Sequence, residues 1–138
     1  MKKLAIFGTG GFAKELLDLA LDQGYSEIYF LEKDIKENQK LLGFSVLPER
    51  DLSKLIDIDF AIGIADPKIR KRLYGIYSDL SYPNLVHSQA TLGYGISEML
   101  EQSKGVVIAA GARVTNSCHF GDFIIVNFNS TIGHDCKI

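Results

Sequence analysis

The sequence is poor in the features that mark several common classes of protein. Its two cysteines do not form the closely spaced pairs of zinc or redox motifs. The net charge of −2 gives no electrostatic footprint for nucleic acid or an anionic membrane. No apolar run approaches the length of a membrane span. Three scattered histidines do not make a metal site. We therefore expect no nucleic-acid partner, no membrane segment and no metal.

The first residues also lack the long apolar stretch of a secretory signal. The charged start is followed by only four apolar residues, 4–7, before glycines interrupt the run. We interpret this run as a buried strand and expect a cytoplasmic protein. The length of 138 residues suits one domain or two small ones.

Apolar residues recur at every sixth position in the last part of the chain. They are Ile108, Val114, Phe120, Val126, Ile132 and Ile138. A helix would place apolar residues every three to four positions and a half-buried strand every second one. A period of six is typical of hexapeptide-repeat β-helices, in which each hexad forms one short strand and one corner. The fourth residue after each apolar one is mostly small, as a narrow interior requires: Ala112, Cys118, Ile124, Ser130 and Cys136.

These hexads predict the first coils of a left-handed parallel β-helix, incomplete, over residues 86–138. Three hexads make one triangular coil, so residues eighteen apart should stack. The expected pairs are Val114 with Ile132, Phe120 with Ile138, and Cys118 with Cys136, the last as reduced thiols. Residues 98–105 break the register and are expected to protrude as a loop. Chance could place six apolar residues in register, but the ladder of small residues argues against it.

Strands and helices alternate in residues 1–85, which predicts a small Rossmann-like parallel sheet. Strands are expected at residues 3–7, 28–31, 44–47 and 59–64, with a surface loop at 33–40. A first helix should bury Leu16, Leu17, Ala20 and Leu21. A second helix should start at Asp66-Pro67 and bury Ile69, Leu73 and Ile76. The predicted fold class is therefore α/β plus all-β.

The motif Gly8-Thr9-Gly10-Gly11-Phe12-Ala13 stands between a predicted strand and a predicted helix and matches G-x-G-x-x-A. Glycines there let a phosphate approach the backbone, and the helix N-terminus favours its negative charge. Glu32 ends the second strand, where an acidic residue would bind a ribose hydroxyl. The context favours a nucleotide diphosphate. NAD would need a second mononucleotide half, for which this region is short. A tight turn without a ligand is the alternative.

His134 and Asp135 are the candidates for acid–base chemistry. His134 lies two places after the inward Ile132, so its ring should reach the outer surface. A neutral imidazole is a base near pH 7, and an adjacent carboxylate can orient it or raise its basicity. A surface histidine followed by a turn aspartate is the alternative. His87 and His119 have no adjacent acid and are expected to be structural.

A series of ordered motifs extends over essentially the whole chain. They are Gly8-Thr9-Gly10-Gly11-Phe12-Ala13-Lys14, Gly24-Tyr25-Ser26-Glu27 with the strand to Glu32, Ala61-Ile62-Gly63, Ile69-Arg70-Lys71-Arg72-Leu73-Tyr74, Asn84-Leu85-Val86-His87, and Asn127 through His134-Asp135-Cys136. With these motifs the chain resembles bacterial nucleotide-sugar acetyltransferases of the sialic-acid O-acetyltransferase (NeuD-like) type. Among these it is most similar to the N-acetyltransferases that modify UDP-4-amino sugars for surface glycan synthesis.

The resemblance implies transfer of an acetyl group from acetyl-CoA, the acyl donor, to an amino or hydroxyl group of a nucleotide-sugar, in particular a UDP-sugar. It implies a homotrimer whose β-helix holds acetyl-CoA at the subunit interface. By resemblance His134 is the general base and Asp135 tunes it. The implied substrate-binding residues are Thr9, Gly10, Gly11, Phe12 and Glu32, with Gly63 beside the uracil pocket.

The sequence departs from the family pattern in two ways. Phe12 stands where the family often has a histidine near the sugar, so that polar contact is missing. The family's later coils, which supply most acetyl-CoA contacts, would follow Ile138, so we interpret the chain as truncated and expect little activity from it. The alternative functions are a nucleotide-sugar-binding fragment without catalysis and, against the hexads, an NAD-linked oxidoreductase.

Overall fold

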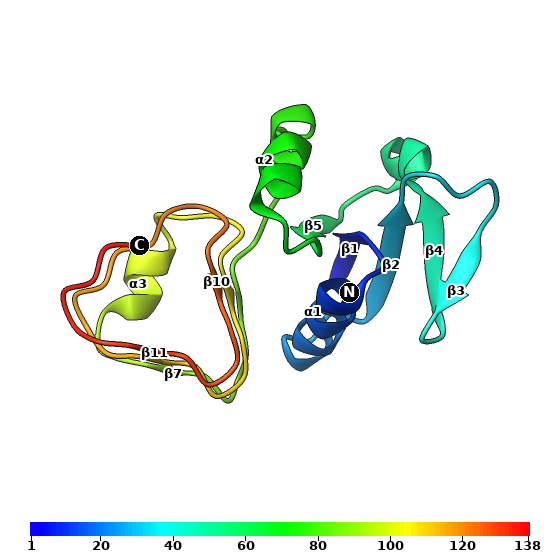
Figure 1. Ribbon diagram of the computed structural model, residues 1–138. Coiled ribbons are helices and arrows are strands. Elements are labelled where there is room, and N and C mark those ends of the chain that lie inside the picture. The colour runs from blue at the N-terminus through cyan, green and yellow to red at the C-terminus, as the bar shows by residue number, and fades with distance from the viewer. The chain divides into compact units, whose positions relative to one another are not determined.

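Two different kinds of β-sheet make up the chain (Figure 1). The computed structural model describes residues 1–138 and divides into two units, Met1–Tyr82 and Pro83–Ile138. The first unit carries the glycine-rich turn and the second carries the hexads. No helix is both long enough and apolar enough to cross a bilayer.

The first unit is built on a five-stranded sheet in the order β3-β4-β2-β1-β5. The strands are β1 (Lys3–Phe7), β2 (Glu27–Glu32), β3 (Gln39–Leu41), β4 (Phe44–Pro48) and β5 (Asp59–Ile62). All are parallel except β3, which pairs antiparallel with β4. The helices are α1 (Gly11–Asp22), α2 (Pro67–Ile76) and the 3-10 helix η1 (Glu49–Lys54). The predicted Rossmann-like parallel sheet is confirmed.

Four of the seven residues predicted to be buried in the two helices are buried, whereas Ile69 is half-buried and Leu21 and Ile76 are exposed. Leu21 is 47% exposed, while Leu19 is buried. Because each helical residue turns by about 100°, the stripe centred on Leu16 and Ala20 lies nearer to Leu19 than to Leu21. Ile76 is 62% exposed, because the ring of the next residue, Tyr77, occupies the apolar position by stacking on Phe7 at 5.3 Å. Asp66 caps α2 as predicted, accepting from the Lys68 N–H at 2.8 Å.

Gly63 follows β5 at a point where three elements meet. A Cβ there would lie 2.7 Å from Ile6 Cγ2, 2.8 Å from the Phe7 carbonyl oxygen and 2.9 Å from Ala13 Cα. Two of these are backbone atoms, which cannot rotate away. Glycine is therefore required for the close packing of α1 on the sheet, whether or not a ligand is bound.

Replacing Gly63 by alanine is expected to destabilise the protein by about 1–3 kcal/mol, the usual cost of overpacking a core. Urea denaturation measures this loss. The control is Gly75→Ala on α2, where a Cβ meets no atom within 4 Å. That variant is expected to gain about 0.5–1 kcal/mol from better helix propensity. Equal stabilities of the two variants would contradict this account of Gly63.

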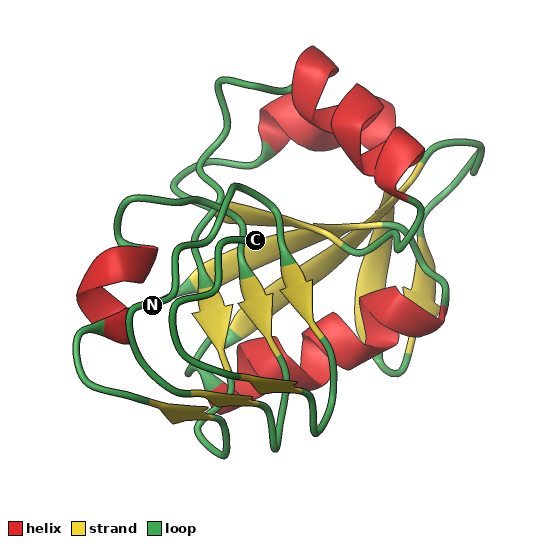
Figure 2. Cartoon of the chain, turned by 60° about the vertical axis from the view of Figure 1, so that its left-hand side comes forward, coloured by secondary structure: helices red, strands yellow, loops and turns green.

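The second unit is a stack of triangular coils, visible along the stack in Figure 1 and turned by 60° in Figure 2. One side is the parallel sheet β10-β8-β6, from β6 (Leu85–Val86), β8 (Val107–Ile108) and β10 (Ile125–Val126). A second side is the parallel sheet β11-β9-β7, from β7 (Thr91–Leu92), β9 (Arg113–Val114) and β11 (Thr131–Ile132). A parallel bridge between His119 and Lys137 marks the third side. The coils predicted from the hexads are confirmed.

Stacking follows the predicted spacing of eighteen residues. Val114 pairs with Ile132. Ile138 lies beside Phe120, because its N–H donates to the His119 carbonyl at 3.0 Å and its own carbonyl accepts from Gly121 at 2.7 Å. The two cysteines are free thiols.

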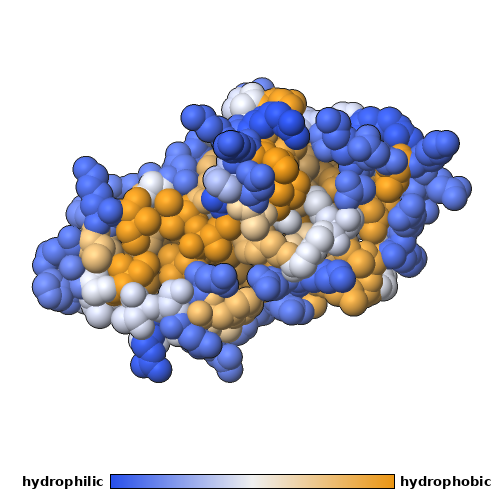
Figure 3. All heavy atoms as spheres, in the orientation of Figure 1, coloured by the Kyte–Doolittle hydropathy of each residue, from blue (hydrophilic) through white to orange (hydrophobic).

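Apolar side chains also gather on the visible face of the second unit (Figure 3), and Ile138 is 45% exposed.

The corners of the coils share one backbone conformation. Every sixth residue from 105 to 135 has a positive φ, between 55° and 73°: Gly105, Gly111, Ser117, Phe123, Asn129 and Asp135. This is the left-handed region, which non-glycine residues seldom enter. The period of six in the sequence is therefore a period of corners as well as of inward side chains.

Residues 98–105 do not protrude as a loop, contrary to the prediction. They continue from α3 (Ile96–Leu100), whose Ile96 and Leu100 belong to the apolar interior of the coils. Asn84 holds the segment, donating to the Leu100 and Ser103 carbonyls at 2.7 and 3.0 Å. Because the two apolar residues are four apart, a single helical turn directs both inward. The insertion therefore folds into the coil.

Candidate functional site

The glycine-rich turn joins β1 to α1 at the carboxyl edge of the first sheet. Gly8 has a φ of +97°, and its N–H donates to the Leu31 carbonyl at 2.8 Å, which ties the turn to the end of β2. A Cβ on Gly8 would lie 2.9 Å from Ile64 Cγ1. The predicted strand–turn–helix arrangement is present, and Gly8 needs to be glycine for both conformation and space.

The N-terminus of α1 is open. Gly10 is its N-cap, without a side-chain cap, and the first turn holds no acidic residue. A Cβ on Gly10 or on Gly11 would meet no atom within 4 Å. The glycines at these two positions are therefore not explained by packing within the chain. They leave the positive end of a 12-residue helix accessible to an anion.

Thr9 and Glu32 lie together beside this turn. The Thr9 hydroxyl donates to Glu32 Oε2 at 2.6 Å, and the Lys33 N–H donates to Glu32 Oε1 at 3.1 Å. Both carboxylate oxygens are thus oriented by neighbours. The structure brings these two predicted residues into contact, and their role in binding a ligand stays a prediction.

The turn also lies at the topological switch point of the sheet, where successive strands begin to be added on the other side of β1. After β1 the chain forms β2 and β4 on one side, whereas β5 pairs on the other side of β1. Open parallel sheets bind ligands in the crevice at this switch point. A pocket of about 70 Å³ opens here, and Gly8, Glu32 and Ile64 line it.

Sequence reasoning missed three charged residues of this pocket, Lys33, Glu49 and Arg72. Glu49 accepts a hydrogen bond from the Tyr77 hydroxyl at 2.7 Å. Burial, together with this carboxylate, raises the pKa of Tyr77 to about 12, so its hydroxyl stays a donor at neutral pH. Arg72 is one of four basic residues in residues 68–72, and the sequence alone did not show which of them faces the pocket.

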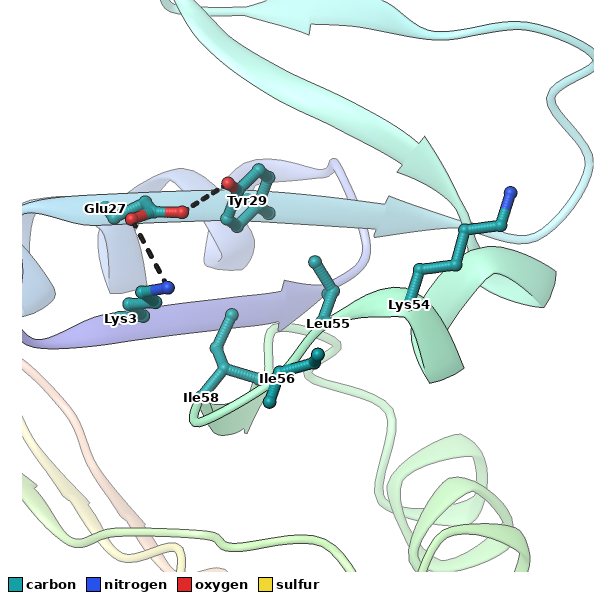
Figure 4. Close-up of a pocket in the computed structure, with 7 residues that line it drawn as sticks. All are labelled: Lys3, Glu27, Tyr29, Lys54, Leu55, Ile56 and Ile58. Carbon is teal, nitrogen blue, oxygen red and sulfur yellow. Dashed lines mark hydrogen bonds and ion pairs between the residues drawn. The ribbon is translucent and has the colours of Figure 1, made fainter.

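A larger pocket of about 220 Å³ lies elsewhere in the first unit (Figure 4). It includes Lys3 and Glu27, the first residues of β1 and β2, and so lies at the opposite end of these strands from the glycine turn. Its polar groups already have partners, since Glu27 accepts from Tyr29 and lies 3.8 Å from Lys3, and Lys54 lies 3.1 Å from Asp51. We place the candidate site at the glycine turn, because position in the sheet is more informative than volume.

The second candidate site is a corner of the β-helix. His134 Nδ1 lies 2.6 Å from Asp135 Oδ2, and the two side chains are 77% and 73% exposed. In the neutral ring this contact favours the tautomer with hydrogen on Nδ1, so Nε2 keeps its lone pair and is available to a substrate. Asp135 has a φ of +60°, and its N–H donates to the Asn116 carbonyl at 3.2 Å.

The remaining predicted residues have simpler surroundings. His87 accepts a hydrogen bond on Nδ1 from the Gln89 N–H at 3.0 Å, and the exposed His119 contributes a backbone bridge. Phe12 is half-buried at the start of α1. No group of three or more His, Cys, Asp or Glu side chains is placed to hold a metal ion.

The family of the first unit follows from its sequence. Residues 3–77, more than half of the chain, match the model of the PglD N-terminal domain. The chain belongs to this family. The family resemblance inferred from the motifs is thereby confirmed.

Solved structures extend the likeness of this PglD-family chain over both units. The acetyltransferase domain of PglB from Neisseria gonorrhoeae FA1090, in complex with acetyl coenzyme A, is 29% identical with a TM-score of 0.83, over 99% of this chain and 66% of that one. PerB from Caulobacter crescentus, in complex with CoA and GDP-perosamine, is 23% identical with a TM-score of 0.83, over 99% and 65%. WeeI from Acinetobacter baumannii AYE is 21% identical with a TM-score of 0.82, over 100% and 66%. The chain spans about two thirds of the length of these structures.

Proposed function

We propose that the chain acts in the transfer of an acetyl group from acetyl-CoA to an amino group, or a hydroxyl group, of a nucleotide-activated sugar. The observation that carries the proposal is the imidazole–carboxylate pair of His134 and Asp135, exposed on a β-helix corner. Membership of the PglD family and the likeness to an acetyltransferase domain that binds acetyl-CoA support it. We further propose the homotrimer and the cytoplasmic setting that the sequence resemblance implies.

The first unit is proposed to hold the nucleotide-sugar. Its diphosphate would lie at the open N-terminus of α1, against the backbone at Gly10 and Gly11. Glu32, held by Thr9, would accept hydrogen bonds from the ribose, and Arg72 offers a cation to the same pocket. We propose uridine as the base, because the motifs are most similar to those of enzymes that act on UDP-4-amino sugars.

The second unit is proposed to supply the base. The amine attacks the thioester carbonyl of acetyl-CoA, and His134 Nε2 takes the proton that the amine loses. The tetrahedral intermediate then breaks its C–S bond, and the departing thiolate takes that proton from the imidazolium. An amide and free CoA result, and His134 returns to its starting state. Asp135 orients the ring and stabilises the imidazolium.

Ligand binding tests this proposal. Titration calorimetry and thermal shifts are measured with a UDP-4-amino sugar, GDP-perosamine, acetyl-CoA and NAD, and the N-acetylated product is followed by mass spectrometry. We expect the UDP-sugar to stabilise the protein, by about 2.7 kcal/mol at a hundredfold excess over Kd. Binding of NAD without any nucleotide-sugar would contradict the proposal. Binding of the sugar nucleotide with neither acetyl-CoA binding nor product would instead identify a binding module.

A further inference from the structure

The two cysteines of the chain are stacked on each other in the second unit. Cys118 and Cys136 are eighteen residues apart, which is the length of one coil. The residues that follow them, His119 and Lys137, form a parallel bridge, and the His119 N–H donates to the Cys136 carbonyl at 2.9 Å. The Cα atoms of the two cysteines are therefore separated by about 4.7–4.9 Å, the spacing of adjacent strands.

Both side chains are directed to the interior of the coils. Cys118 belongs to the buried apolar cluster, and Cys136 packs against this cluster and is partly exposed. Cys118 Sγ donates to the Gly133 carbonyl at 3.0 Å, so the thiol reaches from its own coil to the coil that carries Cys136. A disulfide spans Cα separations of about 4.4–6.8 Å. The pair therefore meets the distance requirement for a disulfide, while both thiols are free in the structure.

The same thiols contact the backbone of the corner that carries His134 and Asp135. The hydrogen bond from Cys118 is made to Gly133, the residue before His134. Cys136 directly follows Asp135, and its Sγ lies 3.8 Å from the His134 carbonyl oxygen. A disulfide has no S–H group, so its formation removes these donors from the two carbonyls. Oxidation of the thiols therefore acts directly on the backbone that positions the imidazole–carboxylate pair.

We propose that Cys118 and Cys136 form a redox modification site, which a hydroperoxide oxidises to a disulfide, and that this oxidation changes the corner that carries His134. Disulfides in a reducing compartment are transient and serve catalysis or redox sensing. The reduced dithiol is the resting state, and a dithiol reductant restores it by thiol–disulfide exchange. Because the chain has no third cysteine, oxidation within one molecule has a single disulfide as its product.

The oxidation balances in two steps. The thiolate of Cys136, the more exposed of the two, attacks one oxygen of the hydroperoxide ROOH. The O–O bond breaks, ROH leaves with the thiol proton, and the sulfur becomes a sulfenic acid. The Cys118 thiolate then attacks this sulfur, so that the S–S bond forms, the S–O bond breaks and water leaves. Two thiols are thus oxidised while the hydroperoxide is reduced by two electrons.

Peptide mapping of the full chain after treatment with hydrogen peroxide tests the disulfide. Trypsin leaves both cysteines in one peptide, because no lysine or arginine lies between Val114 and Cys136. Cleavage before Asp122 separates them. We expect the two fragments to stay joined until a reductant is added, and the mass of the intact monomer to fall by that of two hydrogen atoms. A treated parent whose fragments separate without reductant would show that the site does not exist.

A double variant, Cys136→Ser with Ser130→Cys, is the matched control. It keeps two cysteines at the small inward positions of the hexads, but they are twelve residues apart and lie on different sides of the triangle. Its thiols should stay free or join different molecules. If this variant forms the intrachain disulfide as readily as the parent, the stacking is not the cause and the inference is wrong. Cys136→Ala with Ser130→Cys replaces it if the first double variant does not fold.

Amide NMR spectra of the reduced and oxidised parent test the effect on the corner. The signals of Gly133, His134 and Asp135 should shift on oxidation and return with reductant, whereas that of Gly24 in the first unit should not move. A disulfide that leaves the three corner signals unchanged would overturn the proposed link to His134. Neither measurement uses a nucleotide-sugar or acetyl-CoA, so this inference is tested independently of the proposed function.

Discussion

In a version of the protein that also carries the family's later coils, replacing His134 by alanine is expected to lower the rate of acetyl transfer about 10²–10⁴-fold at neutral pH, the usual effect of losing a general base. Because Asp135 occupies Nδ1 and leaves Nε2 available, the ring presents one basic nitrogen to an amine, and alanine offers none. The KM values of both substrates should change little, since the proton moves only in the transition state. Steady-state kinetics of CoA release measure the effect.

Two variants make the result on His134 specific. Asp135→Asn keeps the left-handed corner, because asparagine tolerates a φ of +60°, and removes only the charge that orients the ring. The kcat of Asp135→Asn should decrease, but by a smaller factor than the kcat of His134→Ala. His119→Ala removes an exposed histidine of the same β-helix and should transfer acetyl groups like the parent. Turnover of His134→Ala close to that of His119→Ala would exclude His134 as the base.

Replacing Gly10 by leucine is expected to weaken UDP-sugar binding at least about 100-fold. This is the effect expected when several charge-assisted hydrogen bonds to the diphosphate are lost together. The fold should survive, because a Cβ at Gly10 meets no atom within 4 Å and its φ of −80° suits any residue. The new side chain would occupy the space through which a diphosphate reaches the helix N-terminus. Calorimetry gives the affinity, and thermal unfolding verifies the fold.

Gly75→Leu is the size-matched control for Gly10→Leu. It places the same side chain in open space on another helix of the same unit. It should bind the UDP-sugar with the affinity of the parent. If Gly10→Leu also binds like the parent, the phosphate does not lie at the glycine turn, and the proposed site in the first unit is wrong.

The features predicted best from the sequence are those set by short-range repetition. The hexads required stacking at intervals of eighteen residues, and Val114 with Ile132 obeys it. The strand–glycine–helix pattern, which is also local in the sequence, correctly predicted the turn at Gly8. β3 was not predicted, because Gln39 and Lys40 are exposed and give no alternation of apolar and polar residues.

The features that escaped prediction depend on long-range geometry. Leu85 pairs with Val107, an interval of twenty-two residues, because α3 is inserted in the first coil. A search at eighteen residues therefore never aligns Leu92 with Val114. Arg72 and Glu49 were missed for a similar reason, since only the folded sheet brings η1 and α2 to one pocket.

The position of α3 makes the first coil different from the coils that follow it. The helix closes the interior of the first coil with Ile96 and Leu100 and exposes Ser97, Glu98 and Glu101, so no further coil can be added there without displacing it. The coils that follow pair β8 with β10 and β9 with β11 at an interval of eighteen residues. A change of length in the hexads therefore keeps this register only in multiples of eighteen residues, whereas any other length has to find room in the interior.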